Sequence, residues 1–201
     1  RNESINLDEW LPEYILNRYG AKDNHALKAW DILRNTVYTV PADKYKRDGA
    51  ESIMQARATF AASTRWANTK LTYDAKDLLP AWDEMIKAIP ACKNSDGFRF
   101  DLVDVTRQVL ANYASPLQQQ FVQAYKNKDA VAFKKYSQQF ITLIEDMNRL
   151  LATRKDFLLG PWIADARKWG NNEKEKALYE FNAKDLITLW GDKNCPLNEY
   201  S

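Results

Sequence analysis

The sequence contains few of the residues from which catalytic and metal centres are usually built. It has one histidine, two cysteines and six glycines in 201 residues. No Gly-rich phosphate loop, nucleophile elbow or zinc-ligand spacing occurs. His25 lies in the first turn of a predicted helix, at a polar position that favours the surface. We therefore expect no metal site, no cofactor and no self-contained catalytic centre.

The two cysteines, Cys92 and Cys195, are too far apart in the sequence for a zinc motif or a small disulfide framework. They could pair only in a fold that brings their Cα atoms within about 7 Å, and the sequence leaves this open. No apolar run approaches the roughly 18 residues of a membrane span, and no signal-peptide pattern is present. The chain opens on Arg1, so we expect it to begin within a longer polypeptide or after processing.

The sequence also has no large excess of positive or negative charge. The 29 basic and 27 acidic side chains give a formal net charge of +2, and the two signs are interspersed. A nucleic-acid partner usually requires a basic face, and a membrane surface requires a basic cluster. The composition therefore predicts neither partner.

Hydrophobic spacing predicts helices throughout and no strands, which indicates an all-α fold, an irregular bundle of about 7–8 helices. Two long helices should form an antiparallel pair, because the link between them is short. The predicted helices cover residues 8–19, 24–38, 74–89, 98–126, 129–153, 161–169 and 172–190.

Proline and glycine mark the expected helix boundaries. Pro90 should end the third helix, and Pro80 should either start that helix near Leu79 or kink it. Pro116 should kink the fourth helix, and Gly191 should terminate the last one. Residues 42–73 form the weakest pattern and are interpreted as a long ordered loop, a kind of segment that often carries function.

Two pairs of carboxylates are candidates for catalysis, since glycoside hydrolysis can use two acids about 5–10 Å apart. Asp101 and Asp104 share one face of a helix, but Arg107 follows Asp104 by one turn, so an ion pair is the simpler explanation. Glu173 and Glu175 open the last helix, where acids stabilise the helix dipole. We predict no catalytic pair in this chain.

Tryptophans near segment ends carry more information. An indole ring can stack on the apolar face of a sugar, and its N–H can donate to a hydroxyl. Most of these tryptophans are expected in the core. Trp162 differs because it follows Gly160-Pro161 at a rigid entry into a helix, where a side chain can be held facing a cleft.

Three stretches resemble one known family. Residues 100–108 (FDLVDVTRQ), residues 157–162 (FLLGPW) and the segment 182–191 ending in TLWG are similar to motifs of α-N-acetylglucosaminidases, glycoside hydrolase family 89. They occur in the family's order and near its spacing. The similarity covers nearly the whole chain and is weakest from residue 42 to residue 73.

The resemblance implies a single helical domain over residues 1–201, the C-terminal part of a larger enzyme, truncated before its last helices. The family removes terminal α-linked N-acetylglucosamine with retention of configuration, and its two catalytic glutamates lie in a (β/α)8 barrel that this chain does not contain. The helical domain would brace that barrel and form one wall of the sugar cleft. Trp162 is the expected substrate contact, and Trp66 is a weaker second.

The same resemblance implies a secreted, periplasmic or lysosomal protein. Two alternatives remain from the residues alone. The chain could be a stand-alone helical protein-interaction module, which the sequence upstream of Arg1 would reveal. The third reading, hydrolysis of glycosides by these residues alone, conflicts with the missing catalytic pair, so the fragment is expected to be inactive by itself.

Overall fold

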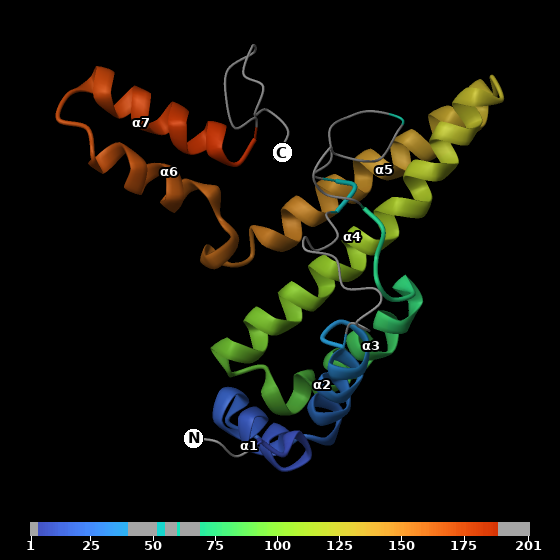
Figure 1. Ribbon diagram of the computed structural model, residues 1–201, viewed down its shortest axis with the longest axis vertical. Coiled ribbons are helices and arrows are strands. Elements are labelled where there is room, and N and C mark those ends of the chain that lie inside the picture. Colours follow the sequence, from blue (N-terminus) through green and yellow to red (C-terminus); the bar gives the residue numbers. More distant parts are fainter. Residues whose placement is uncertain (1–3, 40–51, 55–59, 61–68, 189–201) are drawn as a thin grey trace. The chain divides into compact units, whose positions relative to one another are not determined.

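A computed structural model describes residues 4–39, 52–54, 60 and 69–188. Throughout this described part the secondary structure is helical, with no strand, which confirms the all-α prediction (Figure 1). The elements are α1 (Leu7–Tyr19), α2 (Asn24–Thr36), η1 (Ala75–Leu78), α3 (Leu79–Cys92), α4 (Asp96–Lys126), α5 (Ala130–Leu151), η2 (Lys155–Phe157), α6 (Leu159–Lys168) and α7 (Glu173–Leu186).

The chain divides into two compact units. The first comprises Arg1–Tyr45 and Leu71–Tyr113, and the second comprises Lys46–Lys70 and Ala114–Ser201. Helix α4 therefore gives its first part to one unit and its last part to the other. The expectation of a single domain over residues 1–201 stays a prediction.

The first unit begins with a pair of well-capped helices. The Asn6 side chain accepts a hydrogen bond from the Asp8 backbone N–H, and the Asp23 side chain accepts one from Ala26 N–H. These caps satisfy backbone donors that the helices leave free. Gly20 ends α1 with a φ of 71°, in the left-handed region where a side chain is disfavoured. The two predicted starts are thus confirmed to within a residue.

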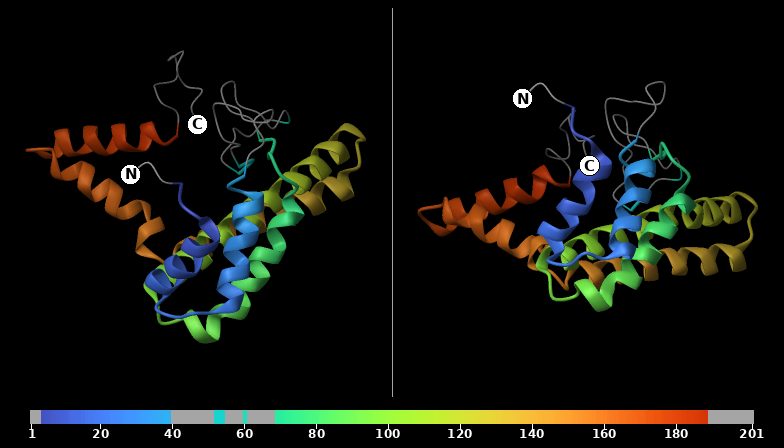
Figure 2. Two further views of the ribbon diagram at one scale, coloured as in Figure 1. Left: turned by 60° about the horizontal axis from the view of Figure 1, so that its bottom comes forward. Right: turned by 90° about the horizontal axis from the view of Figure 1, so that it is seen from below.

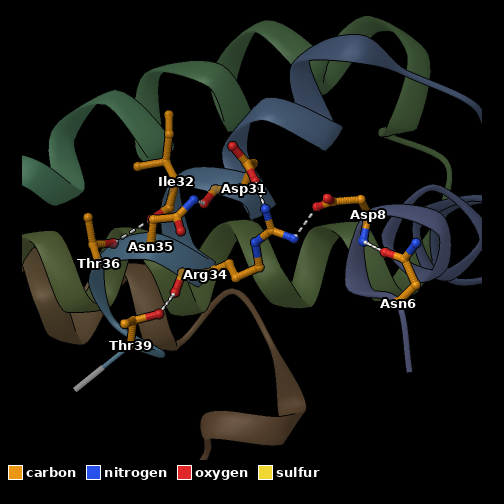
Figure 3. Close-up of polar contacts among 8 residues, drawn as sticks. All are labelled: Asn6, Asp8, Asp31, Ile32, Arg34, Asn35, Thr36 and Thr39. Carbon is orange, nitrogen blue, oxygen red and sulfur yellow. Dashed lines mark hydrogen bonds and ion pairs between the residues drawn. The ribbon is translucent and has the colours of Figure 1, made fainter. Parts of the chain in front are cut away.

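Arg34 ties α1 to α2 on the outside of this unit (Figure 3). One guanidinium nitrogen lies 2.7 Å from the Asp8 carboxylate in α1, and another lies 2.7 Å from Asp31 in its own helix. Asp8 is largely exposed, so this pair orients the helices more than it stabilises them. The stabilisation comes from the apolar faces beneath.

The core of the first unit forms where α1, α2, α3 and the start of α4 meet. One cluster has members from all four helices, and a second joins α2, η1, α3 and α4. The largest fully buried side chains are Phe98, Ile15, Leu78, Met85 and Cys92. The ring of Tyr19 meets Phe98 edge-on at 5.2 Å between centroids, a favourable aromatic geometry.

The prolines of α3 act differently from one another. Pro80 occupies the first turn of the helix, which starts at Leu79, one of the two predicted outcomes. Asp74 caps the preceding 3-10 turn and not α3. Pro90 does not end the helix, contrary to prediction: α3 continues to Cys92, and Lys93 N–H still donates to Ile89 O at 2.9 Å. Proline removes only its own N–H, so a last turn can close around it.

In the second unit the end of α4 and all of α5 run antiparallel, as predicted (Figures 1 and 2). Their contact is aromatic: Phe121 meets Phe133 and Phe140 edge-on at centroid distances of 6.3 and 5.5 Å. Lys128 turns the chain with a φ of 59°, and Asp129 N–H donates back to Ala124 O at 2.9 Å. Helix α4 passes through Pro116 as one helix, and the kink expected there stays a prediction.

Helices α6 and α7 form a hairpin at the end of the described chain. Helix α7 starts after Asn172, whose side chain accepts a hydrogen bond from Glu175 N–H, which is within a residue of the predicted start. It ends at Leu186 and not near Trp190, because Ile187 and Thr188 donate to carbonyls three residues back and tighten the chain into a turn. Trp190 and Gly191 lie outside the described residues.

Candidate functional site

Trp162 is held firmly while keeping part of its surface open. Helix α6 starts at Leu159, with Pro161 in its first turn, as the sequence predicts. The Trp162 indole N–H points across to α7 and donates to the backbone carbonyl of Ala183 at 3.4 Å. The residue nevertheless remains 47% exposed. The indole N–H is thus used within the hairpin, and the ring surface is what this residue can offer to a ligand.

Ion pairs fix the hairpin that carries Trp162. Arg167 on α6 donates to Glu180 at 2.7 Å and to Glu173 at 3.1 Å, both on α7. Hydrogen bonds from Lys184 and Arg167 lower the pKa of Glu180 below its ordinary value. Gly170 permits the tight turn, because a Cβ there would lie 2.4 Å from the Lys176 backbone nitrogen. Contacts from both α6 and α7 therefore fix the part of the chain that carries Trp162.

Helices α6 and α7 also carry other exposed apolar side chains. Trp169, at the end of α6, is 78% exposed, and Phe181 on α7 is 58% exposed. Leu158, Leu159, Leu178 and Leu186 are also exposed. Apolar side chains that are exposed together on one surface mark contacts with ligands or with other parts of a protein. Trp66, the second predicted contact, lies outside the described residues.

Asp101 has a structural position that sequence reasoning missed. It is buried, and the Arg18 guanidinium donates a hydrogen bond to each of its carboxylate oxygens at 2.6 Å. The Tyr19 hydroxyl donates to the same carboxylate at 2.9 Å. Burial and the Asp101 charge raise the pKa of the Tyr19 phenol, and the hydrogen bond to Asp101 raises the pKa of Arg18. Both oxygens of Asp101 thus accept hydrogen bonds from Arg18 or Tyr19, which is a structural role.

A sequence signal for this burial does exist. Asp101 lies one turn after Phe98 and one turn before Val105, so it interrupts an otherwise apolar stripe of α4. A charge in such a stripe needs a buried partner. Its partners lie 82 and 83 residues away in the sequence, which is why local spacing could not identify them.

The other acids behave as predicted. Asp104 accepts from Arg107 at 2.9 Å as an ion pair within one helix. Glu173 and Glu175 occupy the first turn of α7, and Glu175 also accepts from the Asn171 backbone N–H at 2.8 Å. Hydrogen bonds from their neighbours lower the pKa of both glutamates.

His25 and Cys92 form no metal centre with the residues that the structure describes, where no group of three or more His, Cys, Asp or Glu side chains comes together. The His25 side chain is partly exposed, in keeping with the expected surface position, and its Nδ1 lies 2.7 Å from Glu84. That hydrogen bond lowers the pKa of Glu84. Cys92 is a buried free thiol, with its pKa raised by burial. Cys195 lies outside the described residues.

A cavity of about 240 Å³ opens in the first unit between α2, η1, α3 and α4. Its lining joins apolar side chains to the acids discussed above: Trp30, Leu33, Val37, Tyr38, Leu78, Met85, Asp101, Asp104, Val105, Arg107 and Gln108. Sequence reasoning did not find this site, because its lining residues come from four elements.

Comparisons with known proteins agree with one another. The family model described as the alpha-N-acetylglucosaminidase (NAGLU) C-terminal domain matches residues 10–201. The human protein Alpha-N-acetylglucosaminidase is 27% identical over 186 residues, covering 92% of this chain and 24% of the human one.

Solved structures of a family 89 glycoside hydrolase from Clostridium perfringens are similar over 96% of this chain, with 36% identity and a TM-score of 0.90. One is a complex with 2-acetamido-1,2-dideoxynojirmycin, and another, in which two glutamates are replaced by glutamine, holds its substrate GlcNAc-α-1,4-galactose. This chain covers only 22% of that protein and about a quarter of the human relative. No helix in the part of the chain that the structure describes is long and apolar enough to cross a bilayer.

Proposed function

Because the chain belongs to the family of α-N-acetylglucosaminidase C-terminal domains, we propose that it completes the sugar cleft of a retaining exo-α-N-acetylglucosaminidase. The chain would brace a catalytic barrel elsewhere in the same polypeptide and supply one wall of the cleft. The bond-breaking acids would come from that barrel, which fits the ion-paired state of Asp101 and Asp104. Terminal α-linked N-acetylglucosamine glycans would be the substrates.

The main support for this proposal is the way in which Trp162 is held and exposed. Its backbone is fixed at the start of α6, its N–H is anchored to α7, and about half of its surface stays open. A ring held in this way can pack against a sugar at little entropic cost, since it has few rotamers left to lose. The surrounding apolar surface of α6 and α7 suits packing against a neighbouring domain.

The experiment is Trp162→Ala in the intact enzyme, assayed on GlcNAc-α-1,4-galactose. Loss of a stacking surface should lower kcat/KM by about tenfold or more, equivalent to about 1.4 kcal/mol of transition-state binding. Trp162→Phe should recover part of this loss. Trp10→Ala is the matched control, because Trp10 is exposed to a similar degree, 43%, but lies on α1 in the other unit. Unchanged kinetics for Trp162→Ala would remove this residue from the cleft.

The alternative function, a stand-alone interaction module, differs in a directly observable way. It predicts that no barrel-encoding sequence precedes Arg1, whereas the proposed function requires one. The proposed function also predicts that the 201 residues alone hydrolyse no aryl α-N-acetylglucosaminide while remaining folded by circular dichroism. Turnover by the folded fragment would contradict the division of labour. A secreted, periplasmic or lysosomal location belongs to the same proposal and rests on the family resemblance.

A further inference from the structure

The cavity of the first unit combines an apolar floor with a polar and aromatic rim. The floor is lined by Leu33, Leu78, Met85 and Val105, all of them buried. The rim carries the exposed Tyr38, the half-exposed Asp104 and the side chains of Arg107 and Gln108. Small-molecule sites typically show this mixture of apolar walls and a few polar groups.

Trp30 forms a rigid wall of the cavity. Its indole N–H donates to the Tyr19 hydroxyl at 2.7 Å, and that hydroxyl donates to Asp101 at 2.9 Å. The Tyr14 ring meets Trp30 edge-on at 5.1 Å between centroids. These contacts hold the indole in one orientation, so binding against its face would order little that is not already ordered. The Tyr38 ring lies nearly parallel to it, at 8° and a centroid distance of 6.3 Å.

The charges at the cavity cancel in pairs. Asp101 is matched by Arg18, and Asp104 is matched by Arg107. Neither an anion nor a cation would find an unbalanced partner here, and displacing either pair would leave a charge uncompensated. The paired groups still have hydrogen-bonding capacity, because a carboxylate accepts several bonds and a guanidinium donates five. Gln108 adds an amide whose nitrogen is used by Asn112 and whose oxygen can accept.

We propose that this cavity binds a single neutral pyranose ring. The aromatic walls fit the apolar C–H face of a sugar, and the charge-neutral, hydrogen-bonding rim fits its hydroxyls. The volume of about 240 Å³ lies just below the range of roughly 300–1,000 Å³ for drug-sized ligands, so the cavity takes one ring and not a longer glycan. This inference does not depend on the proposed function of Trp162.

Met85 offers a reporter at the floor of the cavity. It is fully buried there, and the chain has three methionines. The intact polypeptide is labelled with [ε-¹³C]methionine, the Met85 methyl signal is assigned with Met85→Leu, and glucose, galactose and N-acetylglucosamine are titrated. We expect a saturable shift of the Met85 signal with a dissociation constant of about 1 mM. The signal of Met147, on α5 in the other unit, should stay in place.

Matched variants connect the shift to the cavity. Gln108→Ala removes a rim amide and should weaken binding about fivefold. Gln123→Ala breaks the same kind of Gln-to-Asn bond four residues apart on the exposed face of α4 and should leave the binding curve unchanged. Tyr38→Ala, at an exposed position, should weaken binding without unfolding the unit.

Charged sugars test whether the cavity selects a neutral ligand. Glucuronate and glucosamine are titrated beside the neutral sugars and should bind more weakly than glucose. Tighter binding of either charged sugar would overturn the proposal, because it would show an unbalanced charge in the cavity. A Met85 signal that shifts linearly with sugar, or not at all, would equally overturn it. Loss of Trp162 function would leave these results untouched, so the two proposals fail separately.

Discussion

At the scale of single residues, Asp101 and Asp104 show how burial decides what a carboxylate does. They lie one turn apart on α4 and both pair with an arginine, but the Asp101 side chain is 10% exposed and the Asp104 side chain is 45% exposed. Asp101→Asn leaves Arg18 without its counter-ion beside the core, so we expect the free energy of unfolding to fall by about 3 kcal/mol. Asp104→Asn breaks a surface pair within one helix and should cost about 0.5 kcal/mol.

Hydrogen–deuterium exchange of the α1 amides measures the difference, because Arg18 and Tyr19 connect α1 to Asp101. Exchange in α1 should accelerate by about a hundredfold in Asp101→Asn, since 1.4 kcal/mol corresponds to a factor of ten. Asp104→Asn serves as the control, with nearly unchanged exchange. Equal protection in the two variants would show that the buried pair does not hold α1.

Sequence reasoning predicted the local pair and missed the long-range one for a physical reason. The Asp104–Arg107 pair follows from helix geometry, which is fixed by sequence spacing. The Arg18–Asp101 pair depends on how α1 and α4 meet, which is fixed by the packing of many apolar side chains. The cavity beside it was missed for the same reason, since its aromatic wall and its charged rim come from different helices.

The buried Tyr19 phenol should make the free energy of unfolding fall at alkaline pH. Burial raises the pKa of Tyr19 above its ordinary value of about 10. The neutral phenol is favoured in the folded state, so its contribution is fully present below pH about 10 and is lost as the pH rises further. Urea unfolding of the chain between pH 8 and about pH 11 should show a falling free energy of unfolding.

Tyr19→Phe should flatten this slope while costing about 1 kcal/mol at neutral pH, because it removes the hydroxyl that joins Trp30 to Asp101. Tyr113→Phe, at an exposed position, controls for the loss of a tyrosine hydroxyl. An unchanged slope in Tyr19→Phe would show that other groups set the alkaline limit.

At the scale of secondary structure elements, the sequence predicted which segments are helical better than where they end. The caps of α1, α2 and α7 follow from Asn6, Asp23 and Asn172, because side-chain oxygens there bond to nearby backbone donors. The C-terminal end of α7 depends on i to i−3 bonds at Ile187 and Thr188, which no residue type signals. Pro90 was misjudged because a proline in the last turn removes only one bond.

The two glycines of the α6–α7 hairpin should respond differently to alanine. A Cβ at Gly160, in the first turn of α6, would meet nothing within 4 Å. Gly160→Ala should leave the stability of the hairpin nearly unchanged, because the gain in helix propensity is offset by the contact between the new Cβ and the Cδ of Pro161, the next residue. A Cβ at Gly170 would lie 2.4 Å from the backbone nitrogen of Lys176 and 2.8 Å from its Cα, so Gly170→Ala should cost about 2 kcal/mol or more.

Urea unfolding followed by circular dichroism, with exchange of the α7 amides, separates the two glycine variants. Faster exchange in α7 for Gly170→Ala, together with unchanged or slower exchange for Gly160→Ala, is the expected pair of results. A Gly170→Ala variant as stable as the parent would mean that the turn can open without loss of the hairpin contacts.

At the scale of the whole molecule, the sequence motifs identified the family, and the family matches confirm it. Local pattern alone gave helices and no catalytic set, but it could not say what the helices serve. The structure adds that Trp162 is anchored and half-exposed, a combination set by the packing of α6 on α7. Its role on the sugar stays a proposal.

The exposed apolar face of α6 and α7 makes a final prediction about the chain in its larger context. Trp162, Trp169 and Phe181 are each more than two-fifths exposed, and burying such rings stabilises by about 2 kcal/mol each. If a neighbouring domain covers them in the intact polypeptide, the isolated 201 residues should self-associate as their concentration rises.

Sedimentation velocity should show this association, and Trp169→Lys with Phe181→Lys should abolish it, because two charges cannot be buried in an apolar contact. Val131→Lys, at an 83% exposed position on α5, should leave the association unchanged. In the intact enzyme the same pair of lysines should lower thermal stability, and an unaffected enzyme would show that this face meets only water.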